Sequence, residues 1–276
     1  MSIIIGSLKK MSVVLEDPVQ YHLTLENQSI SLNAQLGQRI RISYIQTIYC
    51  IKCGRKTKKS FQQGYCFVCY RKLLACGLCL IHPEKCRYYE GICDPNDWAH
   101  AHCVQPQVVY LANSSGLKVG ITSARYFQTR WIDQGATQGL RIFKTQNRYQ
   151  AGILEVALKK YVADKTNWRT MLKENQPPID LIAHRDRILN LADADIKTVM
   201  AKFLGEIEPI LDDPIIQIAY PVLQYLPTIH VFDLDKNPLV EGILQGIKAQ
   251  YLILDTGVIS IRKFGGYCVE WGVNDH

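Results

Sequence analysis

The sequence predicts an α+β protein in which β-rich terminal regions flank a zinc-ribbon-like, cysteine-rich region and a small α/β domain. Apolar residues alternate near both ends, nine of the ten cysteines lie between Cys50 and Cys103, and helical spacing is found in the middle. We expect a β-rich region at 1–48, a cysteine-rich zinc-binding region at 49–105, an α/β domain at 106–176, a helical region at 177–210 and a β-rich region at 211–276.

The terminal regions are expected to form strands. In the N-terminal region, Val19–Leu25 and Arg39–Ile45 alternate between apolar and polar residues. In the C-terminal region, the predicted strands are Leu239–Ile247, Gln250–Leu254 and Val258–Arg262. We expect the two regions to pair in one sheet or small barrel, with the middle of the chain inserted between them.

Two pairs of cysteines open the cysteine-rich region. They are Cys50-Ile-Lys-Cys53-Gly54 and Cys66-Phe-Val-Cys69, and this spacing is typical of a zinc ribbon. Each pair offers two thiolates from one tight turn, and Gly54 suits such a turn because it accepts a positive φ. The sequence therefore predicts a structural zinc ion at Cys50, Cys53, Cys66 and Cys69.

The remaining cysteines of this region predict a second structural zinc ion. They are Cys76, Cys79, Cys86, Cys93 and Cys103, which is one thiol more than a closed site needs. We prefer Cys79, Cys86, Cys93 and Cys103 as ligands, with Cys76 as the leading substitute. The neighbouring histidines are expected to be exposed.

The first half of the cysteine-rich region is strongly basic. No acidic residue lies between Cys50 and Ala75, a span that contains Lys52, Arg55, Lys56, Lys58, Lys59, Arg71 and Lys72. Aromatic residues alternate with these cations, a combination that suits a phosphate backbone and unstacked bases. We predict nucleic acid, either DNA or RNA, as the partner; the alternative is a solvated basic loop whose aromatic residues pack on the metal core.

Hydropathy argues against a membrane protein. The longest apolar run near the start, Ile3–Ile5, is too short for the core of a signal peptide, and no segment approaches the length of a membrane span. We expect a soluble, cytoplasmic protein with no membrane partner.

The middle of the chain alternates between strands and helices. Apolar runs and turn residues predict strands at Val108–Ala112, Leu117–Thr122 and Leu140–Thr145. Helical spacing predicts helices at Arg125–Gln134, Tyr149–Ala163 and Asn167–Lys173, and two more between positions 179 and 205.

Residues 106–176 resemble the GIY-YIG nuclease domain. Val108-Val109-Tyr110 stands where that family has Gly-Ile-Tyr, and Lys118-Val119-Gly120 stands where it has Tyr-Ile-Gly. Arg130, Glu155 and Asn167 follow in the family's order. The chain departs from the pattern because its first motif lacks the glycine and Lys118 replaces the second tyrosine.

The resemblance implies metal-assisted cleavage of a phosphodiester, with Tyr110, Lys118, Arg130, Glu155 and Asn167 as catalytic residues. Glu155 would bind one Mg²⁺, Arg130 would bind the phosphate, and a tyrosine would help to activate water. Arg125 competes for the role of Arg130. The alternative for Glu155 is an ordinary surface ion pair with Lys159, one helical turn further on.

Most of the chain also resembles an uncharacterised bacterial protein family. The motifs that carry this are the two cysteine pairs and the segments Pro83–Cys86, Val109–Thr122, Arg130–Ala136, Asp164–Arg169 and Asp255–Lys263. The resemblance implies a bacterial, cytoplasmic protein and supplies no activity. Gln107 is a departure, because we expect histidine there.

Together these features predict a zinc-stabilised protein that binds nucleic acid. Whether it is also an enzyme stays open; if it is, we expect a Mg²⁺-dependent endonuclease of GIY-YIG type. The first alternative is a non-catalytic DNA- or RNA-binding protein with a degenerate nuclease-like domain. The second is a zinc-dependent protein-interaction module.

Overall fold

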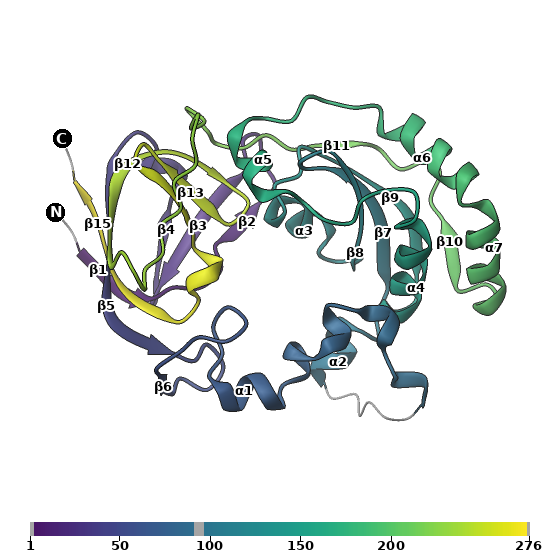
Figure 1. Ribbon diagram of the computed structural model, residues 1–276, viewed down its shortest axis with the longest axis horizontal. Coiled ribbons are helices and arrows are strands. Elements are labelled where there is room, and N and C mark those ends of the chain that lie inside the picture. Colours follow the sequence, from purple (N-terminus) through teal and green to yellow (C-terminus); the bar gives the residue numbers. More distant parts are fainter. Residues whose placement is uncertain (1–2, 91–96, 275–276) are drawn as a thin grey trace. The chain divides into compact units, whose positions relative to one another are not determined.

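Strands from both ends of the chain meet in one antiparallel sheet in the computed structural model, which describes residues 3–90 and 97–274 (Figure 1). Its order is β1 (Ile3–Ser7), β15 (Tyr267–Asn274), β5 (Arg39–Tyr49), β12 (Leu239–Lys248), β13 (Tyr251–Leu254) and β14 (Gly257–Ser260), and β6 (Lys56–Thr57) pairs with β5. The predicted pairing of the terminal regions is confirmed, because β5 lies between two strands from the C-terminal region.

A smaller antiparallel sheet completes the N-terminal β structure. It consists of β2 (Ser12–Val14), β3 (Gln20–Leu25) and β4 (Gln28–Ser31). On β3 the side chains of Tyr21, Leu23 and Leu25 are fully buried, as the alternating pattern predicts. On β5 the same alternation buries Ile40 and Ile42.

The chain divides into two compact units. Unit 1 contains the residues up to Leu73, Leu172–Glu174 and the residues from Ile218 onward, and unit 2 contains Leu74–Met171 and Asn175–Gln217. The predicted cysteine-rich region at 49–105 therefore contributes its first cysteine cluster to unit 1 and its second to unit 2. The predicted five-segment division itself stays a prediction.

Unit 2 is built on a sheet with the order β10 (Ile207–Pro209), β9 (Gln138–Thr145), β7 (Gln107–Asn113) and β8 (Leu117–Ser123), and β11 (Ile216–Gln217) also pairs with β9. Its helices are α2 (Asp97–His102), α3 (Phe127–Asp133), α4 (Arg148–Leu158), α6 (Leu181–Leu191) and α7 (Asp193–Lys202) (Figure 1). Helix α5 (Trp168–Lys173) is divided, because its last two residues belong to unit 1. From β7 to α4 the elements follow the predicted order of strand, strand, helix, strand and helix.

Helix α4 is packed tightly in the core of unit 2. Ala151, Leu154 and Leu158 are fully buried and belong to one apolar cluster with residues of β7, β8 and β9. The helix begins with a capping box, because the side chain of Asn147 accepts from the N–H of Gln150 and Gln150 bonds back to Asn147.

One predicted element end is wrong for a tertiary reason, and one strand was missed. Helix α4 stops at Leu158 instead of Ala163, because the following residues turn back so that the N–H of Val119 donates to the carbonyl of Ala163 at 2.8 Å. Strand β15 was not predicted.

No helix in the described ranges 3–90 and 97–274 combines the length and the apolar character needed to cross a membrane.

Candidate functional site

The first cysteine pair lies in a turn directly after β5. The N–H of Gly54 donates to the carbonyl of Cys50 at 2.9 Å, and Gly54 has a φ of +68°, as the turn prediction requires. The second pair differs from the prediction, because Cys66 immediately precedes helix α1 (Phe67–Lys72) and Cys69 lies inside it. One turn and one helix start therefore present the four thiols to each other.

The four sulfur atoms of Cys50, Cys53, Cys66 and Cys69 all lie within 4.8 Å of one another. The sulfurs of Cys53 and Cys66 are 3.9 Å apart. A zinc–sulfur bond of about 2.3 Å gives a tetrahedron whose edge is about 3.8 Å. The cluster thus has the dimensions of a four-thiolate metal site. Among the described residues, it is the one group in which three or more possible metal ligands lie this close together.

The pKa values of the thiols in this cluster indicate that one thiol is ionised at neutral pH and that full ionisation of all four requires a bound cation. Burial acts to raise the pKa of Cys50, but the backbone N–H groups of Cys66, Cys53 and Lys52 outweigh it and lower the pKa to about 6. The pKa of Cys69 is raised to about 12, by burial and by the three neighbouring sulfurs. Without a metal ion the four thiols cannot all ionise together, and a divalent cation removes that repulsion.

The seven predicted cations around this cluster are all exposed: Lys52, Arg55, Lys56, Lys58, Lys59, Arg71 and Lys72. Within the described ranges, none of them forms an ion pair with a carboxylate of the chain. We name the segment Cys50–Lys72, with its four thiols and seven cations, the basic knuckle.

The aromatic residues of the basic knuckle divide between packing and exposure. The ring of Phe61 contacts the rings of Phe67 and Tyr70, with centroids 5.5 and 5.6 Å apart. Phe67 nevertheless keeps 54% of its surface exposed, and Arg71 lies over its ring at 6.0 Å. Phe67 is therefore the aromatic face that this segment offers to a ligand.

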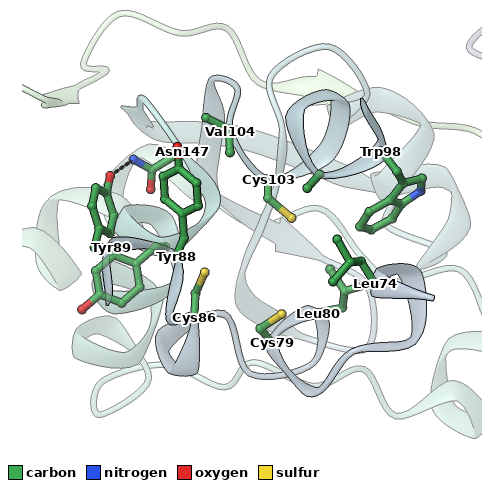
Figure 2. Close-up of a pocket in the computed structure, with 12 residues that line it drawn as sticks. Leu74, Cys79, Leu80, Cys86, Tyr88, Tyr89, Trp98, Cys103, Val104 and Asn147 are labelled. Atoms are coloured by element: carbon green, nitrogen blue, oxygen red, sulfur yellow. Dashed lines mark hydrogen bonds between the residues drawn. The ribbon is translucent and has the colours of Figure 1, made fainter. Parts of the chain in front are cut away.

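Within the described residues, no three sulfur atoms of the second cysteine cluster lie within 4.8 Å of one another, so the predicted second zinc ion has no ligand group there. Cys79, Cys86 and Cys103 line one pocket of unit 2, as Figure 2 shows. Cys76 does not line it, and Cys93 lies outside the described residues.

The residues of the two predicted nuclease motifs lie opposite each other in the sheet of unit 2. Tyr110 on β7 pairs with Gly120 on β8, and a Cβ atom at Gly120 would lie 2.6 Å from the hydroxyl oxygen of Tyr110. The ring of Tyr110 thus occupies the space that the glycine leaves free. Its hydroxyl donates to Oε1 of Gln134 at 2.9 Å, and burial raises its pKa, so it remains protonated at neutral pH.

Lys118 on β8 is only 3% exposed, and its Nζ donates to Oγ1 of Thr166 at 3.2 Å. Burial lowers the pKa of Lys118 to about 8, and the charge of Arg130 adds to this effect, whereas the charges of Glu155 and Asp164 oppose it. A lysine with such a pKa is partly neutral near physiological pH, which gives it the capacity to accept a proton.

Glu155 lies on helix α4, one turn before the helix ends. Burial raises the pKa of Glu155, while Lys159, Arg148 and Arg130 act to lower it. The alternative considered for Glu155, a surface ion pair with Lys159, is not formed, because the Nζ of Lys159 lies 3.0 Å from the carboxylate of Asp164 instead. Within the described ranges Glu155 has no ion-pair partner within 4.0 Å.

The charge of Arg130 acts on each of the residues described above, Tyr110, Lys118 and Glu155. Arg130 acts to lower the pKa of Tyr110, and its charge also acts on Lys118, Arg148 and Glu155. Its competitor Arg125 is exposed, and its guanidinium lies over the ring of Tyr126 at 5.4 Å. We name Tyr110, Lys118, Arg130 and Glu155 the central charged cluster.

Asn167 has a different place. Its side chain accepts from the N–H groups of Arg169 and Thr170 and so caps helix α5, and its own N–H donates to Ser115. This supports the position of the adjacent Thr166, the partner of Lys118. The catalytic role of Asn167 stays a prediction.

Sequence reasoning missed Arg148, the first residue of α4. Its Nη2 donates to the carbonyl of Leu80 at 2.8 Å, and its Nε is buried without a hydrogen-bond partner among the described residues. Burial lowers its pKa. An arginine at a helix N-terminus opposes the helix dipole, and this unfavourable position is the signal that could have revealed it.

Fold and site together define a two-unit α+β protein with a four-cysteine metal-binding cluster. The model of the DUF2797 family, described as a protein of unknown function, matches residues 37–269, and the chain belongs to this family. No curated protein and no solved structure matches it significantly.

We expect Cys53→Ser to lower the zinc content of the purified protein by about one ion per chain and to unfold the basic knuckle, because in so small a module metal binding drives folding. Elemental analysis and limited proteolysis between residues 50 and 72 measure both effects. Cys268→Ser is the matched control, because this buried cysteine lies on β15 outside the four-sulfur group. Unchanged zinc content in Cys53→Ser would refute the assignment.

We expect Lys118→Met to stabilise unit 2 at pH 7. Because the folded pKa lies below the ordinary 10.5, the protonated lysine destabilises the fold below pH 8, and this penalty disappears between about pH 8 and 10.5. The pKa difference corresponds to at most about 3 kcal/mol, less about 1 kcal/mol for the hydrogen bond to Thr166. Urea unfolding at pH 7 and pH 10 measures the effect, with exposed Lys173→Met as control; a gain that does not shrink at pH 10 contradicts it.

Proposed function

We propose that the protein binds nucleic acid through the basic knuckle and cleaves phosphodiesters at the central charged cluster. The observation that supports the catalytic part is that Tyr110 and Lys118 lie on the paired strands β7 and β8, and that the charge of Arg130 on α3 acts on both of them and on Glu155 of α4. The resemblance to the GIY-YIG nucleases supports the same assignment.

The residues present suit a magnesium ion. Mg²⁺ is bound in proteins through one or two carboxylates, several waters and substrate phosphates, and Glu155 is a half-buried carboxylate without an ion-pair partner within the described ranges. When bound there, the ion would polarise the phosphoryl oxygen and stabilise the leaving oxygen.

Three side chains of the protein have the other catalytic roles: binding the phosphate, accepting a proton and orienting neighbouring groups. Arg130 binds the phosphate, because its guanidinium lies among these residues and carries a permanent charge. Lys118 accepts the proton of the attacking water, because its pKa of about 8 leaves a neutral fraction at neutral pH. Tyr110 stays protonated and orients its neighbours as a hydrogen-bond donor to Gln134.

Binding to nucleic acid rests on the basic knuckle. Its seven cations are exposed and, within the described ranges, unpaired, so they are free to contact phosphates. The exposed ring of Phe67 beside Arg71 provides a stacking surface for an unpaired base. A non-catalytic DNA- or RNA-binding protein is the second candidate function, and a protein-interaction module held in shape by zinc is the third.

We expect binding to nucleic acid to weaken steeply with salt. If about five of the seven cations contact phosphates, the slope of log affinity against log salt is about −4 to −5. Replacing Lys56, Lys58 and Lys59 by Gln makes the slope less negative by about 2 to 3. Fluorescence anisotropy with duplex DNA and with single-stranded RNA measures this, and Lys9, Lys173 and Lys236, exposed elsewhere, give the charge-matched control. A flat salt response favours the protein-interaction module.

We expect Glu155→Gln to abolish Mg²⁺-dependent cleavage and to leave affinity for nucleic acid within about twofold. The amide removes the negative charge that would bind the ion, while the basic knuckle is untouched. Gel-based cleavage with and without Mg²⁺ is the measurement. Glu208→Gln is the matched control, because this exposed carboxylate lies on β10 and faces Lys144 at 3.8 Å. If the Glu155→Gln variant cleaves at the wild-type rate, Glu155 is not a metal ligand of the catalytic site. If the wild-type protein does not cleave at all, the second candidate function, a non-catalytic nucleic-acid-binding protein, is favoured.

A further inference from the structure

Residues 163–169 of unit 2 carry the chain from the turn after helix α4 into the start of helix α5. We name them the linking segment. Its first residue, Ala163, forms a parallel bridge with Lys118 of β8, and the N–H of Val119 donates to the carbonyl of Ala163 at 2.8 Å. The linking segment therefore begins directly beside a member of the central charged cluster.

Side chains fix the middle of the linking segment to the same place. The Oγ1 atom of Thr166 lies 2.9 Å from the Oγ atom of Ser114, and it accepts a hydrogen bond from Nζ of Lys118 at 3.2 Å. The next N–H group, that of Asn167, donates to the Oγ atom of Ser115 at 2.8 Å. Although residues 164–167 have no regular secondary structure, these bonds hold them to the turn between β7 and β8.

The charges that the linking segment presents to solvent are positive. Its acidic residue, Asp164, is neutralised by Lys159, whose Nζ lies 3.0 Å from the carboxylate. Lys165 and Arg169 are exposed, and among the described residues neither forms an ion pair with a carboxylate of the chain. Two cations thus lie on a well-fixed segment without an acidic partner.

The side chain of Arg169 is held in a defined orientation. Its guanidinium carbon lies 4.3 Å from the centre of the ring of Trp168, a half-buried side chain, and its backbone N–H donates to Oδ1 of Asn167 at 3.1 Å. Stacking occupies a face of the guanidinium and leaves its N–H edge available for a planar anionic ligand such as phosphate. A side chain ordered in advance loses less entropy when it binds.

The position of the linking segment suits a substrate held at the central charged cluster. Cleavage requires the reacting phosphate to be placed within about 1 Å, and the basic knuckle lies in unit 1 while this cluster lies in unit 2. The Cα atom of Arg169 lies at most about 11 Å from that of Thr166, since three residues separate them. One strand of a duplex advances about 3.4 Å per nucleotide, so this distance corresponds to about three nucleotides.

We propose that Lys165 and Arg169 are a second contact for nucleic acid, in unit 2, where they bind backbone phosphates within a few nucleotides of the phosphate at the central charged cluster. The contact recognises the backbone and not the sequence, because the ring of Trp168 is half-buried and stacked against Arg169. This inference rests on the proposed function, since it names the residues of unit 2 that hold the substrate for cleavage.

Binding of the full-length protein to duplex DNA and to single-stranded RNA tests the proposal, measured by fluorescence anisotropy without added Mg²⁺. We expect Arg169→Gln and Lys165→Gln each to make the slope of log affinity against log salt less negative by about 0.7 to 0.9, and to weaken binding about fourfold to fivefold at about 0.15 M salt. Arg187→Gln, which removes an exposed arginine of α6 in the same unit, is the matched control and is expected to bind as wild type does.

The outcomes separate this inference from the proposed function. If wild type binds and both variants keep its affinity and its salt slope, the second contact is overturned and the basic knuckle remains the binding surface. If wild type binds neither probe, the proposed function is refuted and this inference with it. Arg169→Lys keeps the charge and is expected to restore the wild-type slope; a slope equal to that of Arg169→Gln would show that no phosphate contact was lost and would also overturn the proposal.

Chemical labelling of the wild-type protein needs no variant. We expect saturating duplex DNA to slow the acetylation of Lys165 by an N-hydroxysuccinimide ester several-fold, because a lysine that contacts phosphate is shielded from the reagent. Lys197, exposed on α7 of the same unit, is the internal control and is expected to react equally with and without DNA. Mass spectrometry measures both sites, and an unchanged rate at Lys165 in the complex would overturn the proposal.

Discussion

The structure of unit 2 depends on the close packing of helix α4 between the sheet on one side and the turn at Pro83–Lys85 on the other. On one side Ala151 and Leu154 are buried against the sheet, and on the other Gly152 admits Pro83. Small residues at these positions let the helix approach closely on both sides. The charged residues Arg148 and Glu155 are carried into a half-buried position by this packing, and the shifts of their pKa values follow from it. The central charged cluster is therefore a product of core packing.

Both cysteine clusters occur where an apolar core is thin. Of the basic knuckle's large apolar side chains, Ile51, Phe67 and Val68 are substantially exposed. The residues from Leu74 to Glu90 form a succession of single 3₁₀ turns. The basic knuckle does not bury enough apolar surface to order itself, and ligation of a metal ion by its four sulfurs would supply free energy that packing does not.

Local patterns predicted much of this structure, and long-range packing decided the rest. The spacing of the cysteine pairs predicted the four-sulfur group, and alternation predicted β3, β5 and the C-terminal strands β12, β13 and β14. The sequence did not indicate that Tyr110 would meet Gln134, because that contact depends on the angle at which α3 packs on the sheet. The place of Arg148 likewise depends on a turn at Leu80 that has no periodicity.

The unpaired cations of the basic knuckle also bear on how the protein behaves when its metal is lost. A zinc ion with four thiolates is an anionic complex of about −2 in a segment that carries seven exposed positive side chains. Removal of the ion lets the other thiols take up protons while Cys50, with a pKa of about 6, stays ionised, so the internal counter-charge is reduced and the segment repels itself more strongly. Metal-depleted chains would then adhere more strongly to polyanions of any sequence in an extract, so RNA carried through purification identifies a target only when the zinc content of the sample is complete.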